Sequence, residues 1–352
     1  MKELVPYALR VEMRRASRWL ADARQWPKPT RRRTDNFDAY PYLLVSHSSR
    51  LIKRVDRHLR QFQLNKVHNL RLACARMDGL LIERDEVFSF CRLVGRTGRW
   101  RGYLRGLEMH NGELGGAPGG GLCQLSNLVY WMALHLDQEI LERHRHGFDL
   151  FPDEGRKVPF GMGATVFYNY LDLRFRNSLE QPLLLRVSVQ PPLLCGALYS
   201  DRDKPFDVQI VETAHRFFRD AEGVVWRENR VMKQVSYRDG RAARLEEVAH
   251  NVAKVRYDVA EEMIDTQYAS EPASGSSGEA TEEHQAGPGV VRGGDSGIRE
   301  CRTPGVSQHN RRQCRPRGLR IDDIAKQPCA RSALKLSCRP TATSPSHRAL
   351  FR

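Results

Sequence analysis

One cysteine stands between a glycine-rich run and an apolar helical pattern. Cys123 follows the segment GGAPGGGL, residues 115–122, where the backbone can take turn angles that other residue types avoid. The sequence therefore predicts a helix whose first turn carries Cys123. The unpaired N–H groups and the positive end of the dipole at a helix N-terminus favour a thiolate, which is both a nucleophile and a metal ligand.

Three side chains further along the chain have the types that a cysteine nucleophile needs. His144 and His146 are two residues apart, so on a strand they face the same side. Asp172 lies in a later alternating segment, which we expect to be a neighbouring strand. The predicted catalytic residues are Cys123, His144, His146 and Asp172. In such a site a histidine takes the thiol proton, the aspartate orients the imidazole, and Gln124 or a backbone N–H stabilises an oxyanion.

The same residues allow three other interpretations. Thiolate, imidazole and carboxylate are all zinc ligands, but one cysteine without a close cysteine partner is atypical of a zinc site, so we expect no cofactor. A loop made of Gly119, Gly120, Gly121 and Gln124 could instead cradle a phosphate or pyrophosphate, although it lacks the Lys-Ser/Thr ending of a P-loop. In the third interpretation the glycines form a tight turn and Cys123 packs as a small buried residue.

Hydrophobic spacing indicates the elements that position these side chains. Apolar residues recur at helical spacing after Cys123 and predict one buried helix face; they are Leu125, Leu128, Val129, Met132 and Leu136. An earlier helical pattern ends at Asp78-Gly79, a glycine position typical of helix ends. Short strands are expected at 80–82 and 87–90, and a loop at 91–114.

The chain after the cysteine-bearing helix predicts an antiparallel sheet. Residues 164–177 alternate, with a one-residue shift typical of a bulge. Three apolar runs follow, PLLLRVSV, LLCGALYS and FDVQIVET, and a last hairpin turns at Asp239-Gly240. The predicted fold class is α+β, with N-terminal helices and a central helix that bears Cys123 and packs on an antiparallel β-meander.

Residues 1–62 form a basic region with a helical pattern, and residues 63–266 form the predicted α+β domain. Five apolar residues step along one helix face while arginines occupy much of the remainder; the five are Leu9, Met13, Ala16, Leu20 and Ala23. Such a helix can lie on an anionic membrane surface, or it can pack as an ordinary surface helix on its own domain.

Residues 267–352 differ abruptly in composition from the preceding chain. They are rich in Ser, Gly, Pro and Arg, have almost no apolar periodicity, and contain Cys301, Cys314, Cys329 and Cys338. Such a segment cannot bury enough surface to offset the entropy lost on ordering, so we predict that it is a disordered tail. Out-of-frame translation, as after a frameshift, would explain this composition.

The overall composition narrows the classes of partner. A net charge of +15 over 352 residues implies acidic partners, but no nucleic-acid-binding motif surrounds the arginine-rich segments, so nucleic acid is not expected. The cysteines form no CxxC pair, and no apolar run resembles a signal peptide or a membrane span. We therefore expect a cytoplasmic protein, with peripheral contact to the inner membrane face if the basic N-terminus binds lipid.

Several long motifs resemble the VanW family. They are GGGLCQLSNLVYW, ERHRHGFDLFPDEGR, VPFGMGATVFYNYLDLRFRN, WRENRVMKQV and, upstream, NKVHNLRLACARMDGLLIERDEVFSFCRLVGR. The resemblance extends from about residue 1 to about residue 264. It implies an accessory role in glycopeptide resistance and a context of cell-envelope or peptidoglycan metabolism.

The residues and the resemblance together support two hypotheses. The first is a Cys-His-Asp hydrolase or acyl/amide transferase that acts on a peptide-containing wall precursor. The second is a non-catalytic module that binds an anionic, pyrophosphate-bearing precursor or a membrane surface. Catalysis requires an imidazole within hydrogen-bond reach of the Cys123 thiol, whereas binding does not.

Overall fold

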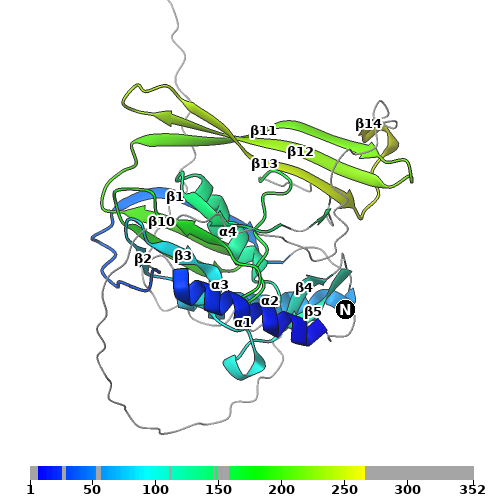
Figure 1. Cartoon of the computed structure of the whole chain (residues 1–352), viewed down its shortest axis with the longest axis horizontal. Coiled ribbons are helices and arrows are strands. Elements are labelled where there is room, and N and C mark those ends of the chain that lie inside the picture. Colours follow the sequence, from blue (N-terminus) through cyan, green and yellow to red (C-terminus); the bar gives the residue numbers. More distant parts are fainter. Residues whose placement is uncertain are drawn as a thin grey trace, which may run out of the picture.

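The computed structural model describes residues 7–25, 29–52, 57–110, 113–145, 147–149, 152 and 158–265. Within these residues, helices and mostly antiparallel sheets form an α+β fold, which confirms the predicted fold class (Figure 1). The tail, residues 267–352, lies outside the described residues. None of the described helices is long and apolar enough to cross a lipid bilayer.

The first sheet and two helices form the body of the molecule. The sheet has the strand order β1-β10-β9-β2, and all neighbouring strands are antiparallel. Its strands are β1 (Tyr42–Arg50), β2 (Leu80–Ile82), β9 (Leu183–Gln190) and β10 (Leu193–Ser200). Helix α2 (Arg60–Met77) packs on β9, and α4 (Cys123–Leu134) packs on β1 and β10. The helix that begins at Cys123 is therefore a core element.

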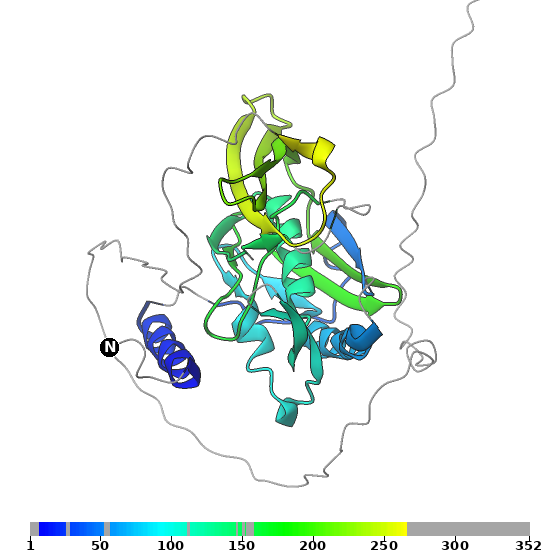
Figure 2. The ribbon, with the colours of Figure 1, turned by 90° about the vertical axis from the view of Figure 1, so that its right-hand side faces the viewer.

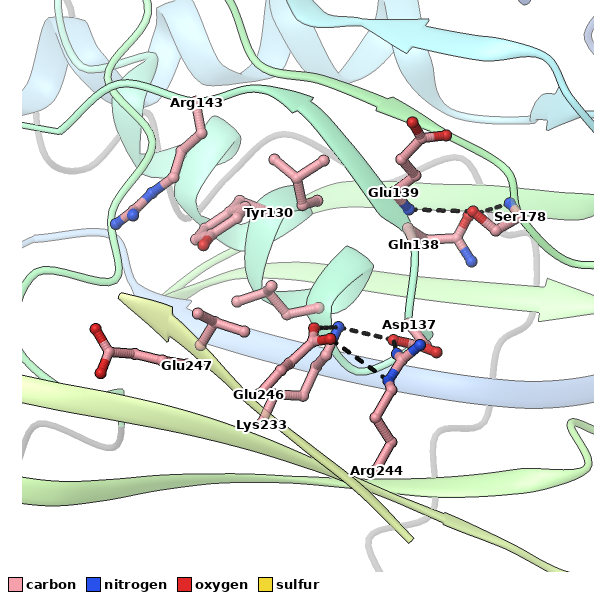
Figure 3. A pocket seen from close by; sticks show the side chains of 13 residues that line it. Tyr130, Asp137, Gln138, Glu139, Arg143, Ser178, Lys233, Arg244, Glu246 and Glu247 are labelled. Carbon is pink, nitrogen blue, oxygen red and sulfur yellow. Dashed lines mark hydrogen bonds and ion pairs between the residues drawn. The ribbon is translucent and has the colours of Figure 1, made fainter. Parts of the chain in front are cut away.

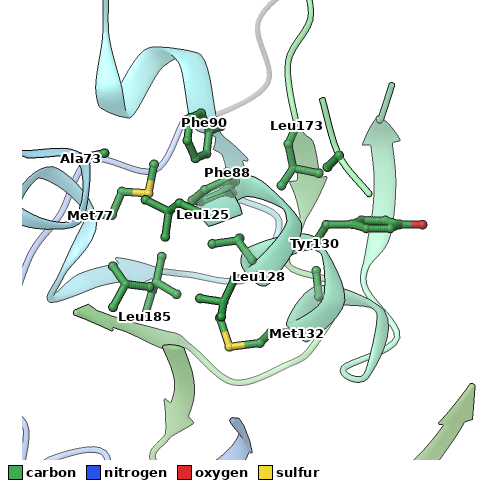
Figure 4. Close-up of a cluster of buried hydrophobic side chains, with 14 of the residues drawn as sticks. Ala73, Met77, Phe88, Phe90, Leu125, Leu128, Tyr130, Met132, Leu173 and Leu185 are labelled. Atoms are coloured by element: carbon green, nitrogen blue, oxygen red, sulfur yellow. The ribbon is translucent and has the colours of Figure 1, made fainter. Parts of the chain in front are cut away.

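The main hydrophobic core includes buried faces of α2 and α4 (Figure 4). Leu125, Leu128 and Met132 project from α4, and Met77 projects from α2. Gly196 of β10 allows α4 to approach the sheet, because a Cβ atom there would lie 2.4 Å from Cδ2 of Leu128. The apolar spacing after Cys123 thus correctly predicts the buried face of this helix.

A second sheet is built mainly from the C-terminal part of the described chain. Its order is β14-β11-β12-β13-β7, with long antiparallel strands β11 (Phe206–Arg219), β12 (Val225–Tyr237) and β13 (Arg244–Val255). Two short strands, β7 (Phe148–Asp149) and β14 (Ile264–Asp265), add parallel edges. Figure 1 shows this sheet lying across the body on the side of α4. The predicted meander is therefore divided between two sheets, since β9 and β10 belong to the first.

Smaller elements connect the two sheets and the helices. A three-stranded sheet has the order β3-β8-β6, from Val87–Ser89, Arg174–Arg176 and Glu139–Glu142 respectively. A hairpin joins β4 (Arg105–His110) and β5 (Glu113–Pro118), so part of the loop expected at 91–114 is a strand. The short helices are η2 (Arg57–Leu59), α3 (Phe90–Val94), η3 (Arg99–Arg101) and η4 (Glu261–Met263).

The segment 164–177 is less regular than its alternating pattern predicts. Only β8, at its end, is a strand. Before it, Phe167 and Leu171 bridge to each other around Asn169, whose φ of 50° places it in the left-handed region. Side chains of α4 hold the preceding backbone, because Ser126 Oγ donates to the carbonyl of Ala164 and the N–H of Ala164 donates to Asn127 Oδ1. This turn is stabilised by contacts with a helix distant in the sequence, so the local alternation of apolar and polar residues does not reveal it.

The N-terminal region contains both a helix and a strand. Helix α1 (Tyr7–Gln25) agrees with the predicted helical pattern. Residues 42–50 form β1, which pairs along its length with β10, so the helical expectation is wrong there. The second half of this strand, SHSSR, is as polar as a surface segment, and its partner strand lies about 150 residues away in the sequence.

Candidate functional site

Cys123 is the first residue of α4, as the preceding glycine run predicts. The residue is half-buried, and its Sγ atom lies 3.9 Å from the carbonyl oxygen of Val166, which accepts a weak thiol hydrogen bond. Burial raises the pKa of the thiol from the ordinary value of 9.0 to about 11, and the hydrogen bond to Val166 offsets only part of this rise. The sulfur is therefore protonated at neutral pH, although its helix position favours a thiolate.

His144 lies just after β6, and its ring contacts a carboxylate. Nε2 of His144 is 2.8 Å from Oε1 of Glu142. The same carboxylate accepts hydrogen bonds from Arg18 of α1 and from the backbone N–H of Asp172. Burial alone would raise the pKa of Glu142, but the hydrogen bonds from His144 and Arg18 outweigh it and lower this pKa to about 2. Among the residues that the structure describes, no hydrogen bond joins His144 to Cys123.

Asp172 is fully buried and links β8 to the start of α3. Its carboxylate accepts hydrogen bonds from Ser89 Oγ at 2.6 Å, from the N–H of Cys91 at 2.8 Å and from Nε of Arg174 at 2.9 Å. Ser89 also caps α3 through its side chain. The structure thus brings the His144 ring and the backbone N–H of Asp172 to the same Glu142 carboxylate. The Asp172 side chain itself is held by hydrogen bonds from Ser89, Cys91 and Arg174.

Gln124 points toward β1. Its amide Nε2 donates to Ser49 Oγ at 2.9 Å and to the carbonyl of Arg50 at 2.8 Å. Both amide protons are therefore used inside the protein. This contact fixes the first turn of α4 against the edge strand of the first sheet.

The three glycines before α4 form a tight turn that packs against α2 and β4. The N–H of Gly119 donates to Leu104 and the N–H of Gly120 donates to Ala117. Gly121 has a φ of 95°, and a Cβ atom there would lie 1.9 Å from Cγ of Lys66, which is buried on α2. Two donors of the predicted anion cradle thus bind the chain itself, and the third glycine makes room for a lysine stem.

His146 lies outside the described residues, so the structure does not place its ring. Within the described parts of the chain, no three His, Cys, Asp or Glu side chains are grouped so that they could hold a metal ion. The interpretation of Cys123, His144, His146 and Asp172 as zinc ligands therefore has no support among the three that are placed.

A cavity of about 510 Å³ lies between α4, β6 and the second sheet (Figure 3). Its polar wall includes Tyr130, Asp137, Arg143, Lys233, Arg244 and Glu246. Nζ of Lys233 is 2.7 Å from Asp137 and 2.5 Å from Glu246, and Arg244 also contacts Asp137. This cavity lies where the body of the molecule meets the second sheet, and the sequence patterns do not indicate it.

Arg143 differs from the other cations of this cavity in its partners. Its guanidinium donates to the backbone carbonyls of Gly161 and Gly163 and lies 4.8 Å from the ring centre of Tyr130. No carboxylate pairs with it among the described residues. Burial lowers its pKa, as expected for a cation withdrawn from water without a neutralising anion. On a strand, Arg143 would point away from the side of His144 and His146 and so toward solvent. The structure instead leaves it half-buried, because residues 161–163 lie against it and accept its hydrogen bonds.

Comparisons with known proteins agree with this architecture. The family model described as VanW like protein matches residues 65–199, which include most of α2, all of α4 and β9, and nearly all of β10. The Vancomycin B-type resistance protein VanW of Enterococcus faecalis (strain ATCC 700802 / V583) is 30% identical over 231 residues, which make up 66% of this chain and 84% of that protein. The chain belongs to the VanW family. The resemblance of the sequence motifs is thereby confirmed.

A second similar protein matches a shorter part of the chain. The uncharacterized protein YoaR of Bacillus subtilis (strain 168) is 31% identical over 139 residues, 39% of this chain and 43% of YoaR. No solved structure matches. The residues matched by the family model include Cys123, but the long strands β11 to β13 lie beyond them.

Proposed function

We propose that this VanW family member is an accessory protein of the bacterial cell envelope that binds a peptide-containing wall precursor and leaves it chemically unchanged. The envelope context rests on the E. faecalis relative, whose name refers to vancomycin resistance. The proposal that the precursor is not chemically changed rests on the surroundings of Cys123. The proposal combines the non-catalytic role of the second hypothesis with the peptide-containing precursor of the first.

The surroundings of the Cys123 thiol are the observation that carries this proposal, and the raised pKa agrees with them. A pKa of about 11 leaves only about one thiol in 10,000 ionised at pH 7. A catalytic cysteine needs a neighbouring base or cation that favours the thiolate, and the thiol hydrogen bond here goes to the carbonyl of Val166. The His144 ring is bound to Glu142, and Asp172 is bound to Ser89 and Cys91. These contacts favour structural roles for Cys123, His144 and Asp172.

Arg143 supports a location for the bound precursor. A half-buried guanidinium beside a cavity, with no carboxylate partner in the described residues, is suited to an anionic group of a ligand. The ring of Tyr130 lies beside it and would contact an apolar part of the same ligand. We propose that a peptide carboxylate of the precursor binds here (Figure 3).

Calorimetry with UDP-N-acetylmuramyl pentapeptide tests the proposal on the full chain, with mass spectrometry of the ligand after incubation. We expect saturable binding, an unchanged ligand mass, and the same affinity for Cys123→Ala. We expect Arg143→Gln to weaken binding at least tenfold, because it removes a charge-assisted hydrogen-bond donor. The matched control Arg238→Gln, at an exposed pair with Asp203, should bind as wild type does.

Two results would overturn the proposal. A product of altered mass that disappears in Cys123→Ala would show that the protein is a thiol enzyme. Failure of the wild-type chain to bind the pentapeptide would exclude the precursor as its ligand.

A further inference from the structure

Helix α1 packs on the body of the molecule through its polar side. Arg15 donates to the carbonyl of Tyr168, Arg18 donates to Glu142 and to the carbonyl of Tyr170, and Asp22 accepts two hydrogen bonds from Arg174 at 3.0 and 2.7 Å. Val11 and Asp22 are buried at this contact. Residues 11, 15, 18 and 22 recur at helical spacing, so they form one face of α1.

The apolar face of α1 is turned away from the body. Leu9, Met13 and Leu20 lie on the side of the helix opposite that contact face, and Trp19 lies at the edge of the apolar stripe. Their exposed fractions are large: Leu9 53%, Met13 60%, Trp19 63% and Leu20 53%. Figure 2 shows α1 at the periphery of the molecule. A helix that packed only to bury its own apolar surface would take the opposite orientation.

We propose that α1 attaches the protein to an anionic lipid bilayer, with its apolar stripe inserted at the level of the headgroups. This inference does not depend on the identity of the ligand bound at Arg143.

Charge and residue types on α1 favour a bilayer as the occupant of this face. Arg10 is exposed beside the apolar stripe, and the exposed Arg14 stacks on Tyr170 on the same flank. Arginines beside an apolar stripe attract anionic headgroups, and tryptophan prefers the boundary between headgroups and acyl chains. Helix α1 has 19 residues, with one apolar stripe and polar residues on its other sides. It is suited to lie along the boundary between headgroups and acyl chains, and it is not apolar enough to cross the bilayer.

The ion pairs beneath α1 determine how the protein would sit on the membrane. Arg18 and Arg174 hold the helix by Glu142 and Asp22, whose side chains are largely buried. The helix is therefore presented in a fixed orientation, with its apolar stripe outward before any lipid is met. Preorganisation of this kind lowers the ordering cost that a disordered anchor would pay on binding.

Vesicle flotation of the full chain tests the proposal. We expect the wild-type protein to float with vesicles that contain 30% phosphatidylglycerol in phosphatidylcholine, and less so with pure phosphatidylcholine. Met13→Ser with Leu20→Ser should reduce partitioning at least tenfold, because insertion scales with the apolar area that enters the bilayer. Arg10→Glu should reduce it about fivefold or more at low salt. The matched control is Leu245→Ser with Met263→Ser, two exposed apolar residues of the second sheet and its end.

Tryptophan fluorescence gives a second measurement on the same samples. A blue shift on adding the anionic vesicles should appear in the wild type and disappear in Trp19→Phe. Equal partitioning of Met13→Ser/Leu20→Ser and wild type would overturn the proposal, as would a failure of the wild type to bind anionic vesicles. A concentration-dependent dimer that those two substitutions abolish would assign the stripe to a second copy of the chain and would also overturn it.

Discussion

Burial has a larger effect on the chemistry of Cys123 than its position at the start of a helix. The first turn of α4 supplies a dipole that favours the thiolate by a modest amount, typically under about 1 kcal/mol at exposed sites. Withdrawal of the sulfur from water acts in the opposite direction and raises the pKa to about 11. The residue type and its place in the sequence predict the helix position correctly, but the pKa depends on the packing of residues around Val166.

We expect the Cys123 thiol to react slowly. A rise in pKa from 9.0 to about 11 lowers the thiolate fraction at neutral pH about 100-fold, so iodoacetamide should label Cys123 at least 100-fold more slowly in the folded protein than in urea. Mass spectrometry of the peptide that contains Cys123 separates it from the other cysteines. Labelling of the folded protein with half-maximal rate near pH 7 would contradict this expectation.

Glu142 should make stability depend on pH in the acidic range. Its pKa falls from 4.5 to about 2 on folding, so its contribution is fully present above pH 4.5 and is lost as the pH decreases toward 2. The shift corresponds to about 3 kcal/mol in the free energy of unfolding. We expect Glu142→Gln to lose about this amount at pH 7 and to flatten the stability profile between pH 4.5 and 2, as measured by urea unfolding.

An exposed ion pair provides the control for Glu142. Glu180 pairs with Arg84, and both side chains are more than half exposed. Glu180→Gln should change the free energy of unfolding by less than about 1 kcal/mol, because solvent screens such pairs. Equal effects of the two substitutions would show that the Arg18 and His144 contacts to Glu142 do not form in solution.

At the scale of elements, the glycine-rich run has two structural tasks. Its first part forms β5, paired with β4, and its last part turns the chain into α4 over the stem of Lys66. Only the second task requires glycine at a left-handed backbone position, at Gly119 and Gly121. The glycines that resemble an anion-binding loop in sequence thus allow the turn before α4 to pack closely against the stem of Lys66.

Gly121 and Gly115 form a matched pair that separates these roles. Gly121→Ala should lower the free energy of unfolding by about 2 kcal/mol or more, because it adds a Cβ 1.9 Å from Lys66 at a φ of 95°. Gly115→Ala should be neutral or slightly stabilising, since no atom lies within 4 Å of the added Cβ. Urea midpoints of the two variants measure the difference. If Gly121→Ala kept full stability, close packing would not explain the glycine at this position, and an anion-binding role for the run would again be favoured.

At the scale of the whole molecule, the second sheet is attached to the body by buried charge. Lys233 of β12 is only 5% exposed and reaches Asp137, which follows α4 with a φ of 54°, as well as Glu246 of β13. The cavity that holds Arg143 lies at this junction. The relative position of the two sheets therefore determines the shape of the proposed binding site.

Lys233→Met should loosen this junction. Removing one partner of a buried pair leaves the other charges uncompensated and commonly costs about 3 kcal/mol, although Arg244 still contacts Asp137 here. Relative to the wild type, we expect this substitution to speed amide hydrogen exchange in residues 206–255 more than in α2. Arg230→Gln, which breaks an exposed pair with Glu247 in the same sheet, is the control and should leave exchange unchanged. Uniform exchange across both variants would show that apolar contacts alone hold the sheet.

Local patterns in the sequence determined the start of α4, the end of α2 and the last hairpin. Gly79 and Gly240 have φ values of 80° and 82°, as expected for glycines that end a helix and turn a hairpin. The apolar face of α4 also follows from spacing alone. These features depend on residues within a few positions of one another, so the sequence contains the information directly.

Only the tertiary structure decided which partners the chemical side chains have. Arg18 meets Glu142 across 124 residues, and the N–H of Cys91 meets Asp172 across 81. These long-range contacts place His144 and Asp172 in structural networks and turn the apolar stripe of α1 outward. Spacing in the sequence cannot show them, because pKa values, ion pairs and the exposed side of a helix depend on whichever distant groups the fold brings into contact.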